Sequence, residues 1–186
     1  MSQNHFSVTR HDVVFKGRVF TIIRDEVRHA SGYASVREVV EHPGGAVVVP
    51  VFDNGDVLLI RQYRYPVKDE IIELPAGKLS RAEDPRHCAA RELEEETGLR
   101  AGELRKLTAM LTTPGFCSEL LHIYLARELS DGVQRLEEGE ESITVFRVPF
   151  SEAIAMCRDG RIHDGKTVTG LMLAALELGM LQATGI

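Results

Sequence analysis

Three glutamates, Glu92, Glu95 and Glu96, have the spacing in this 186-residue chain that most directly suggests chemistry. Positions i, i+3 and i+4 share one face of a helix. Carboxylates held that close repel one another and weaken the helix unless a positive charge lies over them. Hard divalent cations prefer such oxygen ligands. The spacing therefore predicts a divalent-metal site, to which Glu94, on another face, does not contribute.

Residues on either side of the glutamates predict where this helix begins and ends. Asp84 followed by Pro85 is typical of an N-cap with proline in the first turn. Gly98 is typical of a C-terminal cap. Arg91 is expected to pair with a neighbouring carboxylate and hold it in position. The predicted apolar stripe consists of Cys88, Ala89 and Leu93.

The acidic helix is part of a longer pattern that extends from Gly77 to Leu99. A run such as RELEEE alone is more often a solvated helix face than a metal site. The longer pattern is G-x5-E-x7-R-E-U-x-E-E-x-G-U, with U apolar, and a chance match is on the order of one in ten million. Its fixed positions are all met, at Gly77, Glu83, Arg91, Glu92, Leu93, Glu95, Glu96, Gly98 and Leu99. The segment resembles the Nudix box, the signature of hydrolases that cleave nucleoside diphosphates linked to another moiety.

Other segments resemble the ADP-ribose pyrophosphatase subgroup of that family. They are LLIRQYRYP, ELPAGKL, TTPGFCSE, IHDGKTVTGLMLA and the N-terminal VFTIIRDEV and VREVVEHPG. The resemblance covers the chain from about residue 12 onward and includes Pro114, about fifteen residues past the box. It implies a Mg²⁺-dependent pyrophosphatase, with Mn²⁺ as a possible substitute, that hydrolyses ADP-ribose to AMP and ribose 5-phosphate.

The resemblance also assigns roles at the metal site. The metal ligands would be Glu92, Glu95, Glu96, the Ala76 carbonyl and a glutamate of the loop 137–141, and Glu95 and Arg91 would belong to the catalytic residues. A glutamate of that loop would activate or orient the attacking water. The register of the loop leaves Glu141, Glu138 and Glu140 as candidates for the base, with Glu141 preferred, and at least two of its four glutamates are expected to be solvated.

Substrate contacts are implied for a further set of residues. Arg64 would contact the diphosphate or the ribose, since a guanidinium can bind phosphate in a bidentate manner. Strand alternation places Arg61 and Tyr63 on the opposite face from Gln62 and Arg64. The remaining candidates are Phe20, Arg24 and Arg37 around the adenine, with ordinary strand positions as the alternative, and Pro114 and Phe116, with a simple turn at Pro114-Gly115 as the alternative.

Two other functions compete with this reading. Hydrolysis of another nucleotide sugar, such as GDP-mannose or an ADP-hexose, would use every residue of the box and differ in the base and sugar pockets. A non-catalytic domain that senses ADP-ribose is the more distant alternative, and the intact box argues against it.

Composition narrows the class of protein. A net charge of −6 argues against general nucleic-acid binding, although a bound metal would still allow a nucleotide substrate. Three cysteines without CxxC spacing predict free thiols and a reducing compartment. The N-terminus is unlike a signal peptide, and no apolar run approaches the ~18 residues of a membrane span. We expect a cytoplasmic protein without membrane or nucleic-acid partners.

Hydrophobic periodicity predicts an α/β fold, and the resemblance specifies a Nudix-type α/β/α sandwich with a mixed central sheet plus a small N-terminal β-strand region. Residues 1–43 would form that N-terminal region, a probable dimerisation arm of a homodimer, and residues 44–186 the hydrolase domain, with His42-Pro43-Gly44-Gly45 as the break. Strands are expected within 12–40 and over 46–52, 57–64, 71–74, 104–111, 120–126 and 143–148, and helices over the box, 151–160 and 167–181.

Overall fold

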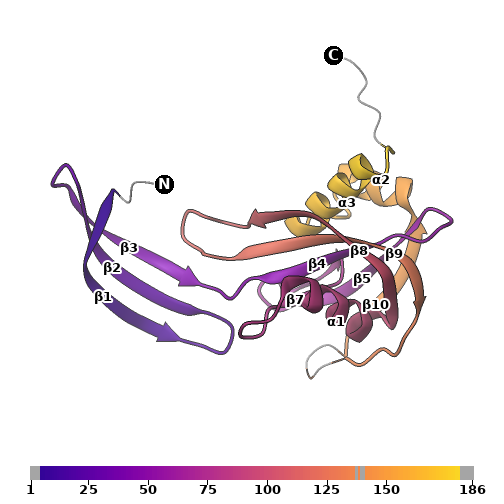
Figure 1. Ribbon diagram of the computed structural model, residues 1–186, viewed down its shortest axis with the longest axis horizontal. Coiled ribbons are helices and arrows are strands. Elements are labelled where there is room, and N and C mark those ends of the chain that lie inside the picture. Colours follow the sequence, from indigo (N-terminus) through magenta and orange to yellow (C-terminus); the bar gives the residue numbers. More distant parts are fainter. Residues whose placement is uncertain (1–4, 137, 139–140, 181–186) are drawn as a thin grey trace, which may run out of the picture. The chain divides into compact units, whose positions relative to one another are not determined.

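The computed structural model describes residues 5–136, 138 and 141–180. The chain forms two compact units (Figure 1). The first contains Met1–Gly44 and Leu111–Leu120, and the second contains Gly45–Met110 and Leu121–Ile186. The division after Gly44 falls in the predicted His-Pro-Gly-Gly break, where proline and glycine interrupt the strand pattern.

The first unit is built on a three-stranded antiparallel sheet in the order β1-β2-β3. Its strands are β1 (Phe6–Lys16), β2 (Thr21–His29) and β3 (Ala34–Glu41). The turn-forming pairs Lys16-Gly17 and Ser31-Gly32 lie at the two connections, and Gly32 has the positive φ of 89° that favours glycine there. β1 begins earlier than predicted because Phe6 pairs with His29, the last residue of β2.

The second unit contains two sheets and three helices. One sheet has the order β10-β5-β6 and the other the order β7-β4-β9-β8. The second is mixed, since β4 pairs antiparallel with β7 and parallel with β9. The remaining elements are β4 (Gly45–Pro50), β5 (Asp56–Arg64), β6 (Asp69–Glu73), β7 (Ala76–Lys78), α1 (Pro85–Thr97), β8 (Leu99–Leu111), β9 (Leu120–Asp131), β10 (Thr144–Pro149), α2 (Phe150–Asp159) and α3 (Gly165–Glu177).

Helices cover both faces of the strands in this unit, α1 on one side and α2 with α3 on the other (Figure 1). β4 is buried along its whole length because its alternate residues serve two cores. Val47 and Val49 pack with α2 and α3, whereas Ala46 and Val48 pack with α1. The predicted α/β/α sandwich with a mixed sheet is confirmed.

Element boundaries differ from the prediction where local pairing extends them. β8 begins directly after the helix-ending Gly98 and not at residue 104. α3 begins at Gly165, two residues early, because Asp164 caps it. The three-residue strand β7 was not predicted, and it exists through pairing with β4. In the described part of the chain, no helix has both the length and the apolar composition needed to cross a bilayer.

Candidate functional site: an acidic cluster on helix α1

Helix α1 has both predicted caps. The Asp84 side chain accepts hydrogen bonds from the backbone N–H groups of Arg86 and His87, with Pro85 in the first turn. At the other end, Gly98 is left-handed with φ 70° and donates its N–H to the Glu94 carbonyl. A helix fixed at both ends cannot slide in register, so the faces of its glutamates are determined.

The glutamates of α1 lie in two different environments, as their spacing predicts. Glu96 is 2% exposed and Glu92 is 7% exposed, although both carry carboxylates. Glu95 is half-buried beside them. Glu94 lies elsewhere and pairs with Arg100, 2.7 Å away. Buried carboxylates are costly unless they are paired or bind a metal, so these side chains need partners in the fold.

Arg91 is the cation that the protein itself supplies. Its guanidinium contacts Glu83 at 3.0 Å, Glu92 at 2.8 Å and Glu95 at 2.8 Å. The hydrogen bond with Glu83 raises the pKa of Arg91 most strongly, and the same bond lowers the pKa of Glu83. The predicted pairing of Arg91 with neighbouring carboxylates is confirmed.

Strand β7 runs beside this helix face. The backbone N–H of Ala76 donates to Glu96 Oε2 at 2.9 Å. Gly77 lies so close to Glu92 that a Cβ built on it would be 1.9 Å from the carboxylate carbon. The loop backbone and the glutamates are thus in direct contact, which is how the Ala76 carbonyl could join the carboxylates as a ligand. That ligand role remains a prediction.

The donor set fits a hard divalent cation. Arg91 contacts Glu83, Glu92 and Glu95, and Glu96 accepts from the Ala76 N–H on the same helix face. Carboxylate oxygens of this kind suit Mg²⁺ or Mn²⁺. Among the described residues, no three acidic, histidine or cysteine side chains already converge on one point. Glu92 and Glu95 instead contact Arg91, each at 2.8 Å.

Cys88 lies beneath the cluster as a neutral thiol. It is fully buried, and burial together with the charges of Glu92 and Glu83 raises its pKa to about 12. Its sulfur is 3.7 Å from the carbonyl oxygens of Gly77 and Lys78, to which the thiol donates. A thiol with this pKa is not a nucleophile at neutral pH, so Cys88 has a structural role here.

Replacing Gly77 by alanine is expected to lower kcat/KM about 100-fold, the order that a displaced catalytic group costs. The added Cβ would meet the Glu92 carboxylate at 1.9 Å. This carboxylate is the far end of a flexible side chain, so it should move away while the fold and Tm stay nearly unchanged. Kinetics and thermal unfolding would measure both. Gly165→Ala is the matched control, because nothing lies within 4 Å of its added Cβ; equal activity of the two variants would contradict the prediction.

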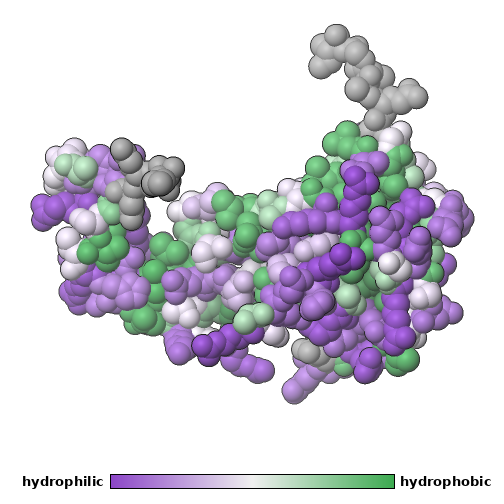
Figure 2. All heavy atoms as spheres, in the orientation of Figure 1, coloured by the Kyte–Doolittle hydropathy of each residue, from purple (hydrophilic) through white to green (hydrophobic). Residues whose placement is uncertain are grey.

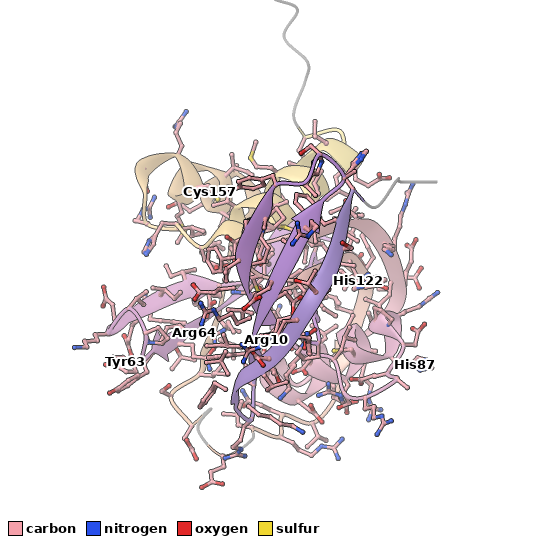
Figure 3. The ribbon with its side chains drawn as sticks, turned by 90° about the vertical axis from the view of Figure 1, so that its left-hand side faces the viewer. Arg10, Tyr63, Arg64, His87, His122 and Cys157 are labelled. Atoms are coloured by element: carbon pink, nitrogen blue, oxygen red, sulfur yellow. The ribbon has the colours of Figure 1, made fainter. Side chains whose placement is uncertain are left out.

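Arg64 is bound side-on by a buried carboxylate. Its Nε donates to Glu73 Oε2 at 2.7 Å and its Nη2 to Glu73 Oε1 at 3.1 Å. The predicted alternation is confirmed, since Gln62 is buried whereas Arg61 and Tyr63 are exposed. Figure 3 shows Tyr63 at the outer edge of the view and Arg64 further in. Burial alone would lower the pKa of Arg64, but the bond to Glu73 and the charges of Glu73, Glu96 and Asp164 raise it.

Sequence reasoning missed the partners of Arg64. Glu73 is 1% exposed and also binds Lys166, which in turn contacts Asp164 at 3.0 Å. The signal was present in the apolar run that contains Glu73, because a charge in a buried strand needs partners. Gln62, on the same face of β5 as Arg64, was assigned no role; its buried Oε1 has no hydrogen-bond partner among the described residues.

The other predicted substrate residues lie in the first unit. In the register of β2 with β3, Arg24 lies opposite Glu38 and Arg37 lies opposite Asp25. Since neighbouring strand residues alternate, the two arginines lie on opposite faces of the sheet. Their contact with the adenine remains a prediction. Arg37 lies over the ring of Phe6 and Phe20 packs near Phe15. Pro114 and exposed Phe116 lie in the turn that leads to the Cys117–Val40 bridge.

The predicted base lies in a loop that the structure describes in part. Glu138 and Glu141 are exposed and in turns, and Glu141 is three residues before the start of β10. Glu140, with Glu137, lies outside the described residues. The role of each remains a prediction.

Known proteins resemble this chain along most of its length. A profile of the NUDIX domain matches residues 41–170. The ADP-ribose pyrophosphatase of Bacillus subtilis (strain 168) is 38% identical over 165 residues, covering 88% of this chain and 89% of that protein. The GDP-mannose pyrophosphatase of Yersinia enterocolitica serotype O:8 is 33% identical over 192 residues, covering 98% of this chain and 94% of that protein.

The fold has a solved counterpart as well. A crystal structure of an ADP compounds hydrolase superposes with a TM-score of 0.84 at 22% identity and covers 97% of both chains. Enzymes of the family whose profile matches depend in general on divalent metals. With the box in helical register and these matches over most of its length, the chain belongs to the NUDIX family.

Proposed function

We propose that this protein is a Mg²⁺-dependent hydrolase of nucleoside diphosphate sugars and that ADP-ribose is its main substrate, cleaved to AMP and ribose 5-phosphate. The observation that carries the proposal is the buried acidic face of α1, where Glu92 and Glu96 are 7% and 2% exposed in front of the β7 backbone. The ADP-ribose assignment is supported by the relative of that name at 38% identity.

Glu92, Glu95, Glu96 and the Ala76 carbonyl would hold the metal, with Mn²⁺ as a possible substitute. When bound, divalent ions would offset the charge of the diphosphate and lower the pKa of a coordinated water. The protein's own contribution is positional. Capped ends fix the register of α1, Arg91 orients Glu95 and Glu92, and the Ala76 N–H holds Glu96. Such preorganised groups contribute largely through orientation and electrostatics.

Glu141 would accept the proton of the attacking water, with Glu138 and Glu140 as the alternatives. Its place in an exposed turn before β10 leaves its carboxylate accessible. Arg64 would bind the diphosphate, and Phe20, Arg24, Arg37, Pro114 and Phe116 are the candidates for base and ribose contacts.

Hydrolysis of GDP-mannose is the second candidate function. It is favoured by the GDP-mannose pyrophosphatase at 33% identity, whose alignment covers 98% of this chain. The acidic cluster would bind the diphosphate through the metal and would not contact the base or the sugar. This candidate therefore uses the same metal ligands and differs in the contacts to base and sugar.

The protein would act as a homodimer in the cytoplasm, with residues 1–43 as the dimerisation arm. β1 leaves Val8, Val13, Val14 and Phe15 between 51% and 62% exposed, and apolar atoms are visible on this sheet in Figure 2. A second copy would cover these side chains. The three free cysteines suit a reducing compartment. A solution mass equal to one 20.7-kDa chain would remove the dimer.

A substrate panel tests the function. ADP-ribose, GDP-mannose, ADP-glucose, NADH and a diadenosine polyphosphate would be incubated with Mg²⁺ or EDTA and the products identified. Fast, EDTA-sensitive formation of AMP from ADP-ribose is expected. Turnover confined to GDP-mannose would keep the metal site and overturn the ADP-ribose assignment. Inactivity on the whole panel would overturn the enzymatic function.

A further inference from the structure

A second cluster of charges lies at the junction of β5, β6 and α3. Glu73 accepts two hydrogen bonds from Arg64 and a further one from Lys166. Lys166 also donates to Asp164 Oδ2 at 3.0 Å. This carboxylate caps α3 by accepting from the Thr167 N–H at 3.0 Å. Glu73 thus links Arg64 of β5 to the first turn of α3, where Lys166 lies 93 residues after Glu73 in the chain.

Glu73 is buried more deeply than either of its cationic partners. Its side chain is 2% exposed, against 14% for Lys166 and 37% for Arg64. A carboxylate this deep needs two cations and a full set of hydrogen bonds to offset its lost hydration. An apolar residue would fill the same space at less cost. The carboxylate of Glu73 holds two cations in place, Arg64 and Lys166.

The backbone between Glu73 and Ala76 connects this cluster with the acidic face of α1. The Leu74 N–H donates to Thr167 Oγ1 at 2.8 Å, and the Pro75 carbonyl accepts from the Val48 N–H at 2.9 Å. The next residue, Ala76, donates to Glu96 at 2.9 Å. Four consecutive residues are therefore fixed from α3, β4 and α1, and the distance from Arg64 to the predicted metal ligands is set by rigid elements.

The way Glu73 binds Arg64 leaves part of the guanidinium for another ligand. The side-on pair uses Nε and Nη2, and Nη1 is not part of it. A guanidinium carries five N–H donors in a fixed plane, so holding one edge directs the opposite one. The Arg64 side chain is 37% exposed, so it is only partly enclosed by the protein.

We propose that Glu73 and Lys166 are positioning residues: Glu73 holds the guanidinium of Arg64 by one edge, and Lys166 anchors Glu73 from α3, so that the free edge of Arg64 is preset to bind a phosphate group of the substrate. The inference rests on the proposed function. It assigns Lys166 an effect on substrate binding that passes through Glu73 and Arg64, without contact between this lysine and the substrate.

A double-mutant cycle tests the assignment. Steady-state kinetics and Tm would be measured for Glu73→Asp, Lys166→Met and Arg64→Ala, and for the first two changes in the Arg64→Ala background. Glu73→Asp keeps the charge and retracts the carboxylate by one methylene. Glu70→Gln is the matched control, since Glu70 is exposed and pairs with Tyr63 on the opposite face of the sheet.

Glu73→Asp and Lys166→Met are each expected to lower kcat/KM about 10-fold to 100-fold in the wild-type background, as changes behind a binding group typically do. In the Arg64→Ala background, each should lower it by less than about 3-fold, because the group that they position is gone. Lys166→Arg should restore most of the loss seen with Lys166→Met, and Glu70→Gln should leave the kinetics unchanged.

Equal losses with and without Arg64 would overturn the proposal, and so would wild-type kinetics of Glu73→Asp and Lys166→Met. If either of these two variants failed to fold, the remaining one would complete its own cycle with Arg64→Ala. The cycle uses whichever nucleotide sugar the wild-type protein hydrolyses, so a wrong ADP-ribose assignment does not affect it. Run by calorimetry as the affinity for ADP-ribose and for GDP-mannose, the cycle needs no turnover, which separates its failure from that of the proposed function.

Discussion

Glu96→Gln is expected to lower kcat by on the order of 10³-fold while the fold stays intact. Glu96 is the most buried carboxylate of α1, at 2% exposure, and a predicted metal ligand. A glutamine has the same size, and its amide oxygen can still accept the Ala76 N–H, which the glutamate accepts at 2.9 Å. The lost quantity is the negative charge that a divalent cation needs.

Stability in the absence of metal should change much less than activity. Without metal, the glutamine keeps the size of the side chain and the hydrogen bond from the Ala76 N–H, so the Tm in EDTA should stay close to that of the wild type. With Mg²⁺, the increase in Tm that ligand binding gives the wild type should be largely lost. Glu94→Gln is the matched control on the same helix, because Glu94 pairs with Arg100 instead. Near-wild-type turnover of Glu96→Gln would contradict the metal site.

Arg91→Met should lower both activity and stability. Without the guanidinium, the carboxylates of Glu83, Glu92 and Glu95 lose the cation that lies 2.8 to 3.0 Å from each. Because the Arg91 side chain is 32% exposed, solvent weakens its ion pairs. We expect the free energy of unfolding to fall by about 2 kcal/mol, or roughly 4–8 °C in Tm for a chain of this size. Misplaced Glu92 and Glu95 should lower kcat by about 100-fold.

The dependence of the Tm loss on Mg²⁺ and on pH distinguishes the loss of Arg91 from a general disruption of packing. Mg²⁺ should recover part of the lost Tm, since it replaces the missing positive charge. The pKa of Glu83 is lowered from 4.5 by Arg91, so their pairing stabilises the fold fully above pH 4.5 and is lost as the pH falls through the lower folded-state value. The Tm difference from wild type should therefore narrow below about pH 4.5. Arg100→Met, which removes the exposed pair with Glu94, is the control for the Mg²⁺ dependence. A Tm difference that ignored both Mg²⁺ and pH would contradict the role of Arg91.

The parts of the site that sequence predicts are those with short-range causes. The caps at Asp84 and Gly98 act within one turn, and they fix the face on which Glu92 and Glu96 lie. The buried strand β4 is equally clear, because residues that face two cores must all be apolar. The function class follows from the same segment, since the box combines cap, register and charge in one stretch of sequence.

The parts that sequence reasoning missed depend on long-range pairing. Glu73 and Lys166 are 93 residues apart, and only the tertiary fold, in which α3 packs against β4, brings them together. The opposite faces of Arg24 and Arg37 follow from the register of β2 with β3, which no single strand pattern specifies. β7 has three residues and no periodicity of its own, so its pairing with β4 had no local signal.

The most direct test of the central claim is an anomalous difference map from crystals of the protein soaked with Mn²⁺. We expect manganese at the acidic face of α1, coordinated by Glu92, Glu95 and Glu96 and by the Ala76 carbonyl, with Glu92 and Glu95 turned away from Arg91. Manganese bound elsewhere, with Arg91 still holding Glu92 and Glu95, would contradict the account.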